Sequence, residues 1–400
     1  MNEGEIVKGT PLTLSVVKIH AESVRERVME KELFDPDRYT TRSDGEVHFP
    51  IIIPRNRDRD WVRGILGPLS DFTSISGDLS LTVPGGRTPN PYEKARLILG
   101  DHMTEEELTY LPDRWEKVGD CIVLSLGAEI MERKIMIAKA YIEATRSRFC
   151  LLNRGGVGGE LRIPDVEILI PPADGSTEVV HREGGISYVL DPTRIMFSSG
   201  NTGERRRSAR YIDENPAIPS SGETGGMIES EDVLDMFAGI GYFTLPIGKN
   251  TGCGSVTACE KNPVSFEYLI RNIELNGLSG KVKPILGDNR ESLPERFADR
   301  IVMGYVGGTI DYLDRALHYL RDRGGIIHLH DTVKVEDGPG HLFELSREIA
   351  SDHGYEAELL GSRRVKSYAP RIDHVVLDIR FIAREQGKAA ARKYHHGKVI

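Results

Sequence analysis

The second half of the chain alternates short apolar stretches with helical ones, and this alternation constrains the fold more than any other feature. Five strands are predicted, at Asp232–Phe237, Ser255–Cys259, Val282–Leu286, Arg300–Met303 and Gly325–His330. Helical patterns follow three of them, at Pro263–Asn276, Thr309–Arg321 and His341–Ser351. Strands that alternate with helices at this spacing form βαβ units and a parallel sheet.

Two further strands are predicted after these five, at Tyr355–Leu360 and His374–Phe381. The segment between them, SRRVKSYAPRID, is polar and is expected to join them as an antiparallel pair. The predicted fold class is therefore α/β. It is a Rossmann-like sheet of seven strands whose last pair is antiparallel, preceded by two smaller α+β domains.

Two stretches rich in proline, glycine and serine divide the 400 residues into three parts. One runs from Pro84 to Pro91 and the other from Asn215 to Gly226, and neither can hold a regular element. A helix is expected at Glu22–Leu33, and the glycine-rich run Gly155–Gly159 is expected to form a hairpin turn. The predicted divisions are a small domain over residues 1–85, a middle domain over 90–214, the Rossmann-like domain over 227–385 and a solvated basic tail over 386–400.

The composition is that of an ordinary globular protein, with 39% hydrophobic and 28% charged residues. The sequence contains neither an apolar run of membrane-span length nor a signal-peptide pattern at its start, so we expect a cytoplasmic protein, and a monomer. Four cysteines without a CxxC pair argue against a disulfide framework and a structural zinc site. With a net charge of −9, any RNA must be bound by local basic patches.

The segment VLDMFAGIGYFT, from Val233 to Thr244, carries the strongest chemical signal. A hydrophobic strand runs into a Gly-x-Gly turn and then into a helix, so the backbone can approach a ligand without an intervening Cβ. Alone this is only a strand–helix turn, but Glu260 ends the next strand, where a carboxylate can accept both hydroxyls of a ribose. Asp288 ends the third strand, where it can accept from an adenine amino group while the amide of Asn289 pairs with a ring nitrogen.

Three strand ends in register predict an adenosine site at the carboxyl edge of a parallel sheet. The dinucleotide pattern Gly-x-Gly-x-x-Gly is incomplete, because Thr244 stands at its last position, and this favours S-adenosylmethionine over NAD. The run from His328 to Asp331, HLHD, places two histidines on one strand face. No third ligand follows at a convincing spacing, so we expect a buried strand with polar residues at its end and no metal.

These motifs resemble a family of tRNA-modifying class I enzymes that act on the purine 3′ of the anticodon. The resemblance rests on DMFAGIGYFT, ACEKNP, RNIELNG and GDNR, and upstream on MFSSGN followed by Glu204-Arg205. Two kinds of enzyme share this core: the tRNA guanine-N1 methyltransferase and the wybutosine-pathway enzyme that transfers the 3-amino-3-carboxypropyl group of S-adenosylmethionine. The N-terminal segment KELFDPDRYTTRSDGEVHFPI is similar to a small domain that engages the tRNA body.

The end of the fourth strand separates these two activities. Methyltransferases that act on base nitrogens usually place Asn-Pro-Pro or Asn-Leu-Pro there, whereas this chain has MGYVGG from Met303 to Gly308. That segment resembles the archaeal aminocarboxypropyl enzyme. The resemblance implies transfer to C7 of 4-demethylwyosine at position 37 of phenylalanine tRNA, with release of methylthioadenosine. Guanine-N1 methylation at the same position is the alternative, and a tRNA-binding protein without catalysis is the alternative from another class.

The resemblance also implies roles for particular residues. Ser198 and Arg205 would hold the donor, with Arg205 at its carboxylate; otherwise they are a strand-end cap and a solvated arginine. Tyr305 is a candidate wall for stacking the base, or it packs beneath its loop, and no catalytic base is identified. The residues implied in donor binding are Ser198, Arg205, Phe237, Ala238, Gly239, Glu260, Asp288 and Asn289.

Basic residues gather in two further places and are candidates for phosphate contacts, although a solvated surface is the alternative for each. They are Arg206, Arg207, Arg210, Arg363, Arg364, Lys366 and Arg371.

Overall fold

The computed structural model describes residues 10–31, 33–35, 38–43, 45–54, 57–84, 90–159, 161–197, 199–215, 217 and 230–384. The chain divides into two compact units, Met1–Glu93 and Lys94–Ile400. Ser198, most of both predicted linkers and the basic tail lie outside the described residues. No helix in the described ranges is long and apolar enough to cross a membrane.

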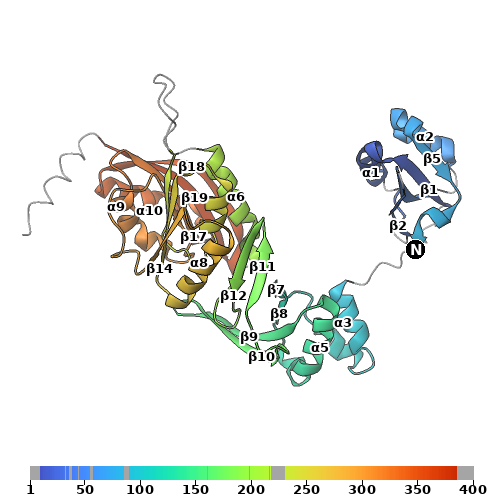
Figure 1. Ribbon diagram of the computed structural model, residues 1–400, viewed down its shortest axis with the longest axis horizontal. Coiled ribbons are helices and arrows are strands. Elements are labelled where there is room, and N and C mark those ends of the chain that lie inside the picture. The colour runs from blue at the N-terminus through green and yellow to red at the C-terminus, as the bar shows by residue number, and fades with distance from the viewer. Residues whose placement is uncertain are drawn as a thin grey trace, which may run out of the picture. The chain divides into compact units, whose positions relative to one another are not determined.

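The first unit is a small sheet with helices packed on it (Figure 1). Its sheet has the order β3-β4-β1-β5, and β2 pairs with β6. The predicted helix is present as α1. Helix α2 was not predicted; Asp58 caps α2 at its N-terminus by accepting a hydrogen bond from the Trp61 amide at 2.9 Å. The elements are β1 (Thr10–Val17), α1 (Ala21–Glu30), β2 (Arg38–Tyr39), β3 (Thr41–Arg42), β4 (Glu46–Ile53), α2 (Arg59–Leu66), β5 (Thr73–Ser76) and β6 (Val83–Pro84).

The division between the two units falls within the first turn of α3, and the second unit continues as an α+β part whose sheet has the order β10-β9-β8-β7. A hairpin forms here as predicted, because β9 and β10 pair antiparallel, but its turn lies later than expected: Gly156 and Gly158 are strand residues of β9, paired with Asp165 and Ile163. Strands β11 and β12 form another hairpin. The elements are α3 (Pro91–Leu99), α4 (Glu105–Thr109), β7 (Glu116–Val118), β8 (Cys121–Leu124), α5 (Lys134–Thr145), β9 (Phe149–Gly158), β10 (Ile163–Ile170), β11 (Val179–Glu183), β12 (Ile186–Leu190) and α6 (Thr202–Glu214).

The rest of this unit is the predicted seven-stranded sheet, with the order β15-β14-β13-β16-β17-β19-β18. Strands β13 to β17 are parallel and β19 runs antiparallel to both neighbours, so the fold prediction is confirmed. The elements are β13 (Asp232–Asp235), α7 (Thr244–Asn250), β14 (Ser255–Glu260), α8 (Pro263–Leu275), β15 (Val282–Leu286), β16 (Arg300–Met303), a 3₁₀ helix η6 (Thr309–Tyr312), α9 (Leu313–Tyr319), β17 (Gly324–Lys334), α10 (Gly338–Asp352), β18 (Tyr355–Ala369) and β19 (Ile372–Ala383).

The final hairpin is longer than predicted. The polar segment expected to connect its strands is itself paired, with Arg363 opposite Val376 and Lys366 opposite His374. Strand β18 is the edge of the sheet, where one row of backbone groups faces solvent and charged side chains are tolerated. The pairing brings residues of both strands to the carboxyl edge of the parallel strands, where the candidate site lies.

The α+β part and the seven-stranded sheet share one hydrophobic core. Phe149 and Tyr188 from the α+β part are fully buried in the same cluster as Leu245 and Val302 of the sheet domain. Separating the two parts would expose these apolar side chains to water, so the shared core holds the two parts together. The α+β part can therefore contribute fixed side chains to a site on the sheet.

Candidate active site

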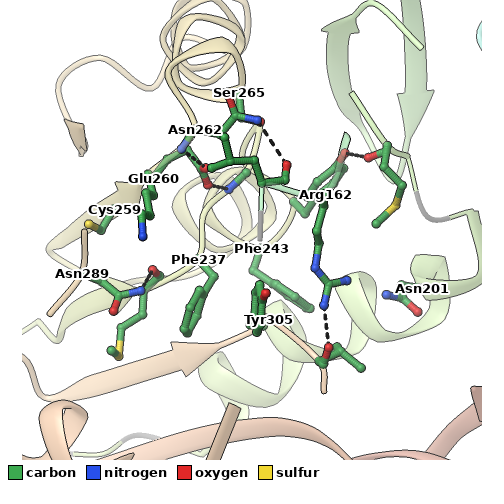
Figure 2. Close-up of a pocket in the computed structure, with 18 of the residues that line it drawn as sticks. Arg162, Asn201, Phe237, Phe243, Cys259, Glu260, Asn262, Ser265, Asn289 and Tyr305 are labelled. Atoms are coloured by element: carbon green, nitrogen blue, oxygen red, sulfur yellow. Dashed lines mark hydrogen bonds between the residues drawn. The ribbon is translucent and has the colours of Figure 1, made fainter. Parts of the chain in front are cut away.

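A cavity of about 450 Å³ opens at the carboxyl ends of the parallel strands. The ends of β13, β14, β15 and β16 all contribute to its wall, together with the β9–β10 turn, the start of α6 and the β18–β19 hairpin. In Figure 2, Glu260 and Asn289 lie at one end of the cavity and Asn201 at the other, with Phe237 and Tyr305 between them. Adjacent parallel strands end at one edge, which is why residues far apart in sequence meet here.

Glu260 lies at the end of β14 and faces the turn that follows β13. Its two carboxylate oxygens accept from the backbone amides of Gly239 and Asn262, both at 2.7 Å. A carboxylate has about four acceptor positions, so hydroxyl groups of a ligand can still donate to it. Burial raises the pKa of Glu260, and the two amide donors oppose that rise.

The glycine turn is held from beneath by Asp235, which is fully buried and does not line the cavity. Its carboxylate accepts from Thr244 Oγ1 at 2.7 Å and from the Phe237 amide at 3.2 Å. Burial raises the pKa of Asp235 to about 6. Gly239 has φ +56, and a Cβ there would lie 2.9 Å from the Tyr242 ring, so the turn requires glycine for both conformation and space.

Asp288 and Asn289 follow β15, as the sequence predicts, and both line the cavity. Asp288 is bound by Arg290, whose Nη2 lies 2.6 Å from Oδ2, and by Lys261 at 3.1 Å. The hydrogen bond from Arg290 holds the pKa of Asp288 well below its usual range. Asn289 donates to the Met236 carbonyl at 2.8 Å, and its buried Oδ1 has no partner among the described residues.

Tyr305 forms part of the cavity wall through a stack of three groups. Its ring lies on Phe237 with centroids 5.2 Å apart and an interplanar angle of 28°. The Arg162 guanidinium lies 4.5 Å from the Tyr305 ring centroid and donates to the Val306 carbonyl at 2.5 Å. Such a cation–π contact fixes the ring plane. Arg162 comes from the β9–β10 turn, and no local signal in its sequence indicated this role.

The loop after β16 takes its shape from Asp331, which is 2% exposed. Its Oδ1 accepts from the amides of Gly307 at 3.1 Å and Gly308 at 2.9 Å, and its Oδ2 from the Ile310 amide at 2.8 Å. Val306 in this loop has φ +61, a conformation that a β-branched residue adopts only when its surroundings impose it. A Cβ at Gly304 would lie 2.8 Å from the Phe243 ring, so a larger residue at the Gly304 position would displace Phe243.

The HLHD run is part of a buried strand, as predicted, but β17 continues beyond it to Lys334. His328 lies between Asp378, whose Oδ1 is 2.6 Å from its Nδ1, and Arg300 at 2.8 Å. The strand continues because β19 pairs with it along its whole length. Asp331 is therefore a mid-strand residue and not the polar end of a strand.

Arg205 lines the cavity from α6 but is 2% exposed and bonded to a carboxylate of the protein. Its Nε and Nη2 donate to the two oxygens of Glu183 at 2.8 and 2.6 Å. It is therefore not the solvated arginine of the alternative interpretation. Its contact with a donor carboxylate stays a prediction.

The far end of the cavity is polar. Asn201, Lys366, Tyr368 and His374 line it. Burial lowers the pKa of Lys366, and burial together with the charge of Lys366 lowers the pKa of His374 to about 4. His374 is therefore neutral near pH 7. Lys366, predicted as a phosphate contact, is thus placed in the cavity wall by the structure.

The other predicted phosphate contacts differ in their freedom to reach RNA. Arg207 and Arg363 are both ion-paired with Glu204, whose side chain is 3% exposed. Arg206, Arg210, Arg364 and Arg371 are exposed. Their part in RNA binding stays a prediction.

The TRM5/TYW2 methyltransferase domain matches residues 223–358, and the TYW2 N-terminal domain matches residues 95–173. The tRNA(Phe) (4-demethylwyosine(37)-C(7)) aminocarboxypropyltransferase of Pyrococcus horikoshii is 38% identical over 294 residues, which are 74% of this chain and 98% of that protein. The chain belongs to the TYW2 family. The family prediction made from the sequence motifs is thereby confirmed.

Two solved structures extend this assignment. The crystal structure of P. horikoshii TYW2 in complex with MeSAdo has a TM-score of 0.61 and 37% identity, and covers 73% of this chain and 99% of that chain. Trm5b from Pyrococcus abyssi has a TM-score of 0.64 and 28% identity, and covers 93% of this chain and 99% of that chain. The likeness to TYW2 leaves about a quarter of this chain unmatched, whereas the likeness to Trm5b reaches nearly all of it.

Proposed function

We propose that this chain transfers the 3-amino-3-carboxypropyl group of S-adenosylmethionine to C7 of 4-demethylwyosine at position 37 of phenylalanine tRNA. The TYW2 relatives named for this reaction support the proposal, because the chain spans nearly their full length. The observation that carries it is the loop after β16, which Asp331 and Arg162 hold with Tyr305 in the cavity wall. Neither asparagine nor proline stands in that loop.

The residues at the β14 and β15 ends fit an adenosine group. The Glu260 carboxylate can accept from ribose hydroxyls, and the Asp288 carboxylate from the adenine amino group. The buried Asn289 Oδ1, which has no partner among the described residues, is another acceptor at this end. Phe237 offers an apolar face, and Ala238 and Gly239 form the turn beside it. Ser198 and Arg205 are proposed to bind the methionine arm.

The donor, when bound, supplies a sulfonium whose three attached carbons are all electrophilic; attack at Cγ breaks the Cγ–S bond, leaves the electron pair on sulfur and releases methylthioadenosine. Which carbon reacts is decided by orientation, so the contribution of this chain is to position the two reactants. C7 loses its proton after the new bond forms. Direct transfer from sulfur to carbon needs no nucleophile from the protein, and burial raises the pKa of the Cys259 thiol to about 12, which disfavours its thiolate.

Tyr305 is proposed to stack on the tricyclic base. Stacking on an aromatic side chain is a common way to hold a base that has left its helix. Arg162 and Phe237 keep the Tyr305 ring in one plane before the base arrives, which reduces the entropy lost on binding. A carbon nucleophile needs no acceptor for an N–H group, which agrees with the absence of asparagine and proline from this loop.

The test offers the full chain two phenylalanine tRNAs, one with guanosine and one with 4-demethylwyosine at position 37. We expect methylthioadenosine with the tricyclic tRNA only, and a mass gain of one aminocarboxypropyl group in that tRNA. S-adenosylhomocysteine formed with the guanosine tRNA would contradict the proposal and favour the guanine-N1 methyltransferase, the activity named for Trm5b, whose chain is 29% identical. Binding without any by-product would indicate a protein without catalysis.

A further inference from the structure

A group of three metal-ligating side chains lies outside the cavity, on the helices that flank β17. Asp314 and His318 belong to α9, and His353 follows the last residue of α10. One ligand atom from each lies within 4.8 Å of the other two. In the part of the chain that the structure describes, this is the one such group of three. None of the three residues lines the cavity.

The three ligand atoms lie close enough together to converge on one ion. Asp314 Oδ1 lies 2.5 Å from His353 Nε2 and 3.9 Å from His318 Nε2. The two imidazole rings have centroids 5.2 Å apart and are nearly perpendicular, at 80°. Nitrogen and oxygen ligands bind Zn²⁺ at about 2.0–2.2 Å, so an ion would replace the direct contact between Asp314 and His353, and side-chain rotations would move these two atoms apart to receive it.

The two backbones that carry the ligands are fixed before any ion binds. Leu313 and Leu317 of α9 are buried in the same core cluster as Leu342 and Ala350 of α10. The amide of His353 donates to the carbonyls of Ile349 and Ala350, so its main chain is held at the helix end. Asp314 and His318 are four residues apart on one helix, a spacing that places both on one face.

The neighbouring Arg315 side chain does not form an ion pair with the three ligands. Arg315 on α9 turns its guanidinium to Glu295 at 3.1 Å and to the Tyr319 hydroxyl at 3.0 Å. The three ligands are partly exposed, with side-chain exposures of 62%, 42% and 28% for Asp314, His318 and His353, so an ion can reach them and keep water at its open positions.

We propose that Asp314, His318 and His353 bind a divalent transition-metal ion, with Zn²⁺ the best match to two imidazoles and one carboxylate. Mg²⁺ and Ca²⁺ prefer sets made of oxygen ligands and fit less well. The ion would tie α9 to the end of α10. Because it binds the folded chain, it would raise the melting temperature. The proposal does not depend on the transferase reaction.

The test is calorimetric titration of the metal-free full chain with Zn²⁺ and with Mg²⁺. We expect saturable Zn²⁺ binding, a rise in melting temperature and no comparable effect of Mg²⁺. His318→Ala and His353→Ala should each weaken Zn²⁺ binding by more than about tenfold, because even the loss of an outer-shell partner costs about 10–100-fold. The matched control is His341→Ala, which removes an exposed histidine of α10 and should bind Zn²⁺ as the unaltered chain does.

Two results would overturn the proposal. If Zn²⁺ does not bind, Asp314 and His353 form only a surface hydrogen bond. If binding survives in both His318→Ala and His353→Ala, with circular dichroism unchanged, the ion is held elsewhere, for example by His395 and His396.

Discussion

Glu260 shapes the turn after β13 and faces the cavity with the same carboxylate. Glu260→Gln keeps the size of the side chain but turns one acceptor oxygen into a donor, which must face either the Gly239 or the Asn262 amide. Hydrogen bonds to a charged group contribute about 1.5–3 kcal/mol each, so affinity for S-adenosylmethionine should fall by more than about tenfold. Calorimetric titration measures this change.

The control is Glu267→Gln, which makes the same change on an exposed residue of α8 and should leave the affinity unaltered. Equal affinities for the two variants would exclude Glu260 from the donor site.

Asp331 is the second residue on which the site depends, although it lies beneath the cavity wall. Asp331→Asn leaves an NH₂ group facing at least one of three backbone amides, and a buried unsatisfied donor costs about 1–3 kcal/mol. We expect a lower melting temperature and reduced transfer to the tricyclic tRNA. Asp337→Asn, on an exposed residue after the same strand, should change neither. Full activity of Asp331→Asn would show that the loop does not need this carboxylate.

The roles of some of these residues could be predicted from the sequence, and the roles of others could not. Glu260 and Asp288 could be predicted, because each ends a strand and parallel strand ends share an edge. Asp331 lies inside a strand and acts on amides more than twenty positions earlier, and its role depends on how β16 and β17 are placed side by side. Arg162 reaches a loop 144 residues away, and nothing in its local sequence indicates that contact. Long-range partners of this kind require the packed fold.

The pairing of β17 with β19 buries a pair of imidazoles beside the cavity. His330 Nδ1 lies 3.4 Å from His374 Nε2, and both side chains are about 1% exposed. The sequence predicted β18 and β19, but it did not predict that the polar segment between them is also paired. Charged residues are unfavourable in a strand unless the strand lies at an edge, as β18 does. The hairpin therefore brings Lys366 and His374 to the cavity.

This burial makes stability depend on pH. The pKa of His374 is about 4 in the folded chain and about 6.5 in the unfolded chain, so as the pH falls the imidazole takes up its proton first in the unfolded chain. The free energy of unfolding is therefore unaffected by protonation of this group above pH 6.5, and it decreases as the pH falls from 6.5 toward 4. His374→Gln should lose less stability than the unaltered chain between pH 7 and pH 5, as thermal unfolding would measure. If the melting temperatures of His374→Gln and the unaltered chain fell equally between pH 7 and pH 5, His374 would not be desolvated.

A chain of net charge −9 must bind tRNA through local cations. The Arg363–Glu204 pair is unsuited to this, because Glu204 is 3% exposed and reversing Arg363 would leave it facing a like charge at a cost to folding. Arg371 is 84% exposed and pairs with Glu336, which is 55% exposed, so this is an ion pair of the weak surface kind and Arg371 can exchange it for a phosphate. Arg364 is 59% exposed, and although its partner Asp373 is only 13% exposed, its guanidinium remains accessible to a phosphate.

Reversing both charges, in Arg364→Glu with Arg371→Glu, should weaken tRNA binding and flatten its dependence on salt. Each phosphate contact that is lost should lower the slope of log affinity against log salt by about one. The control is Lys283→Glu, which changes charge on β15 at the opposite edge of the same sheet. If the slope and affinity of the double variant match those of Lys283→Glu, the tRNA does not contact the β18–β19 hairpin, and the exposed arginines of α6 become the stronger candidates.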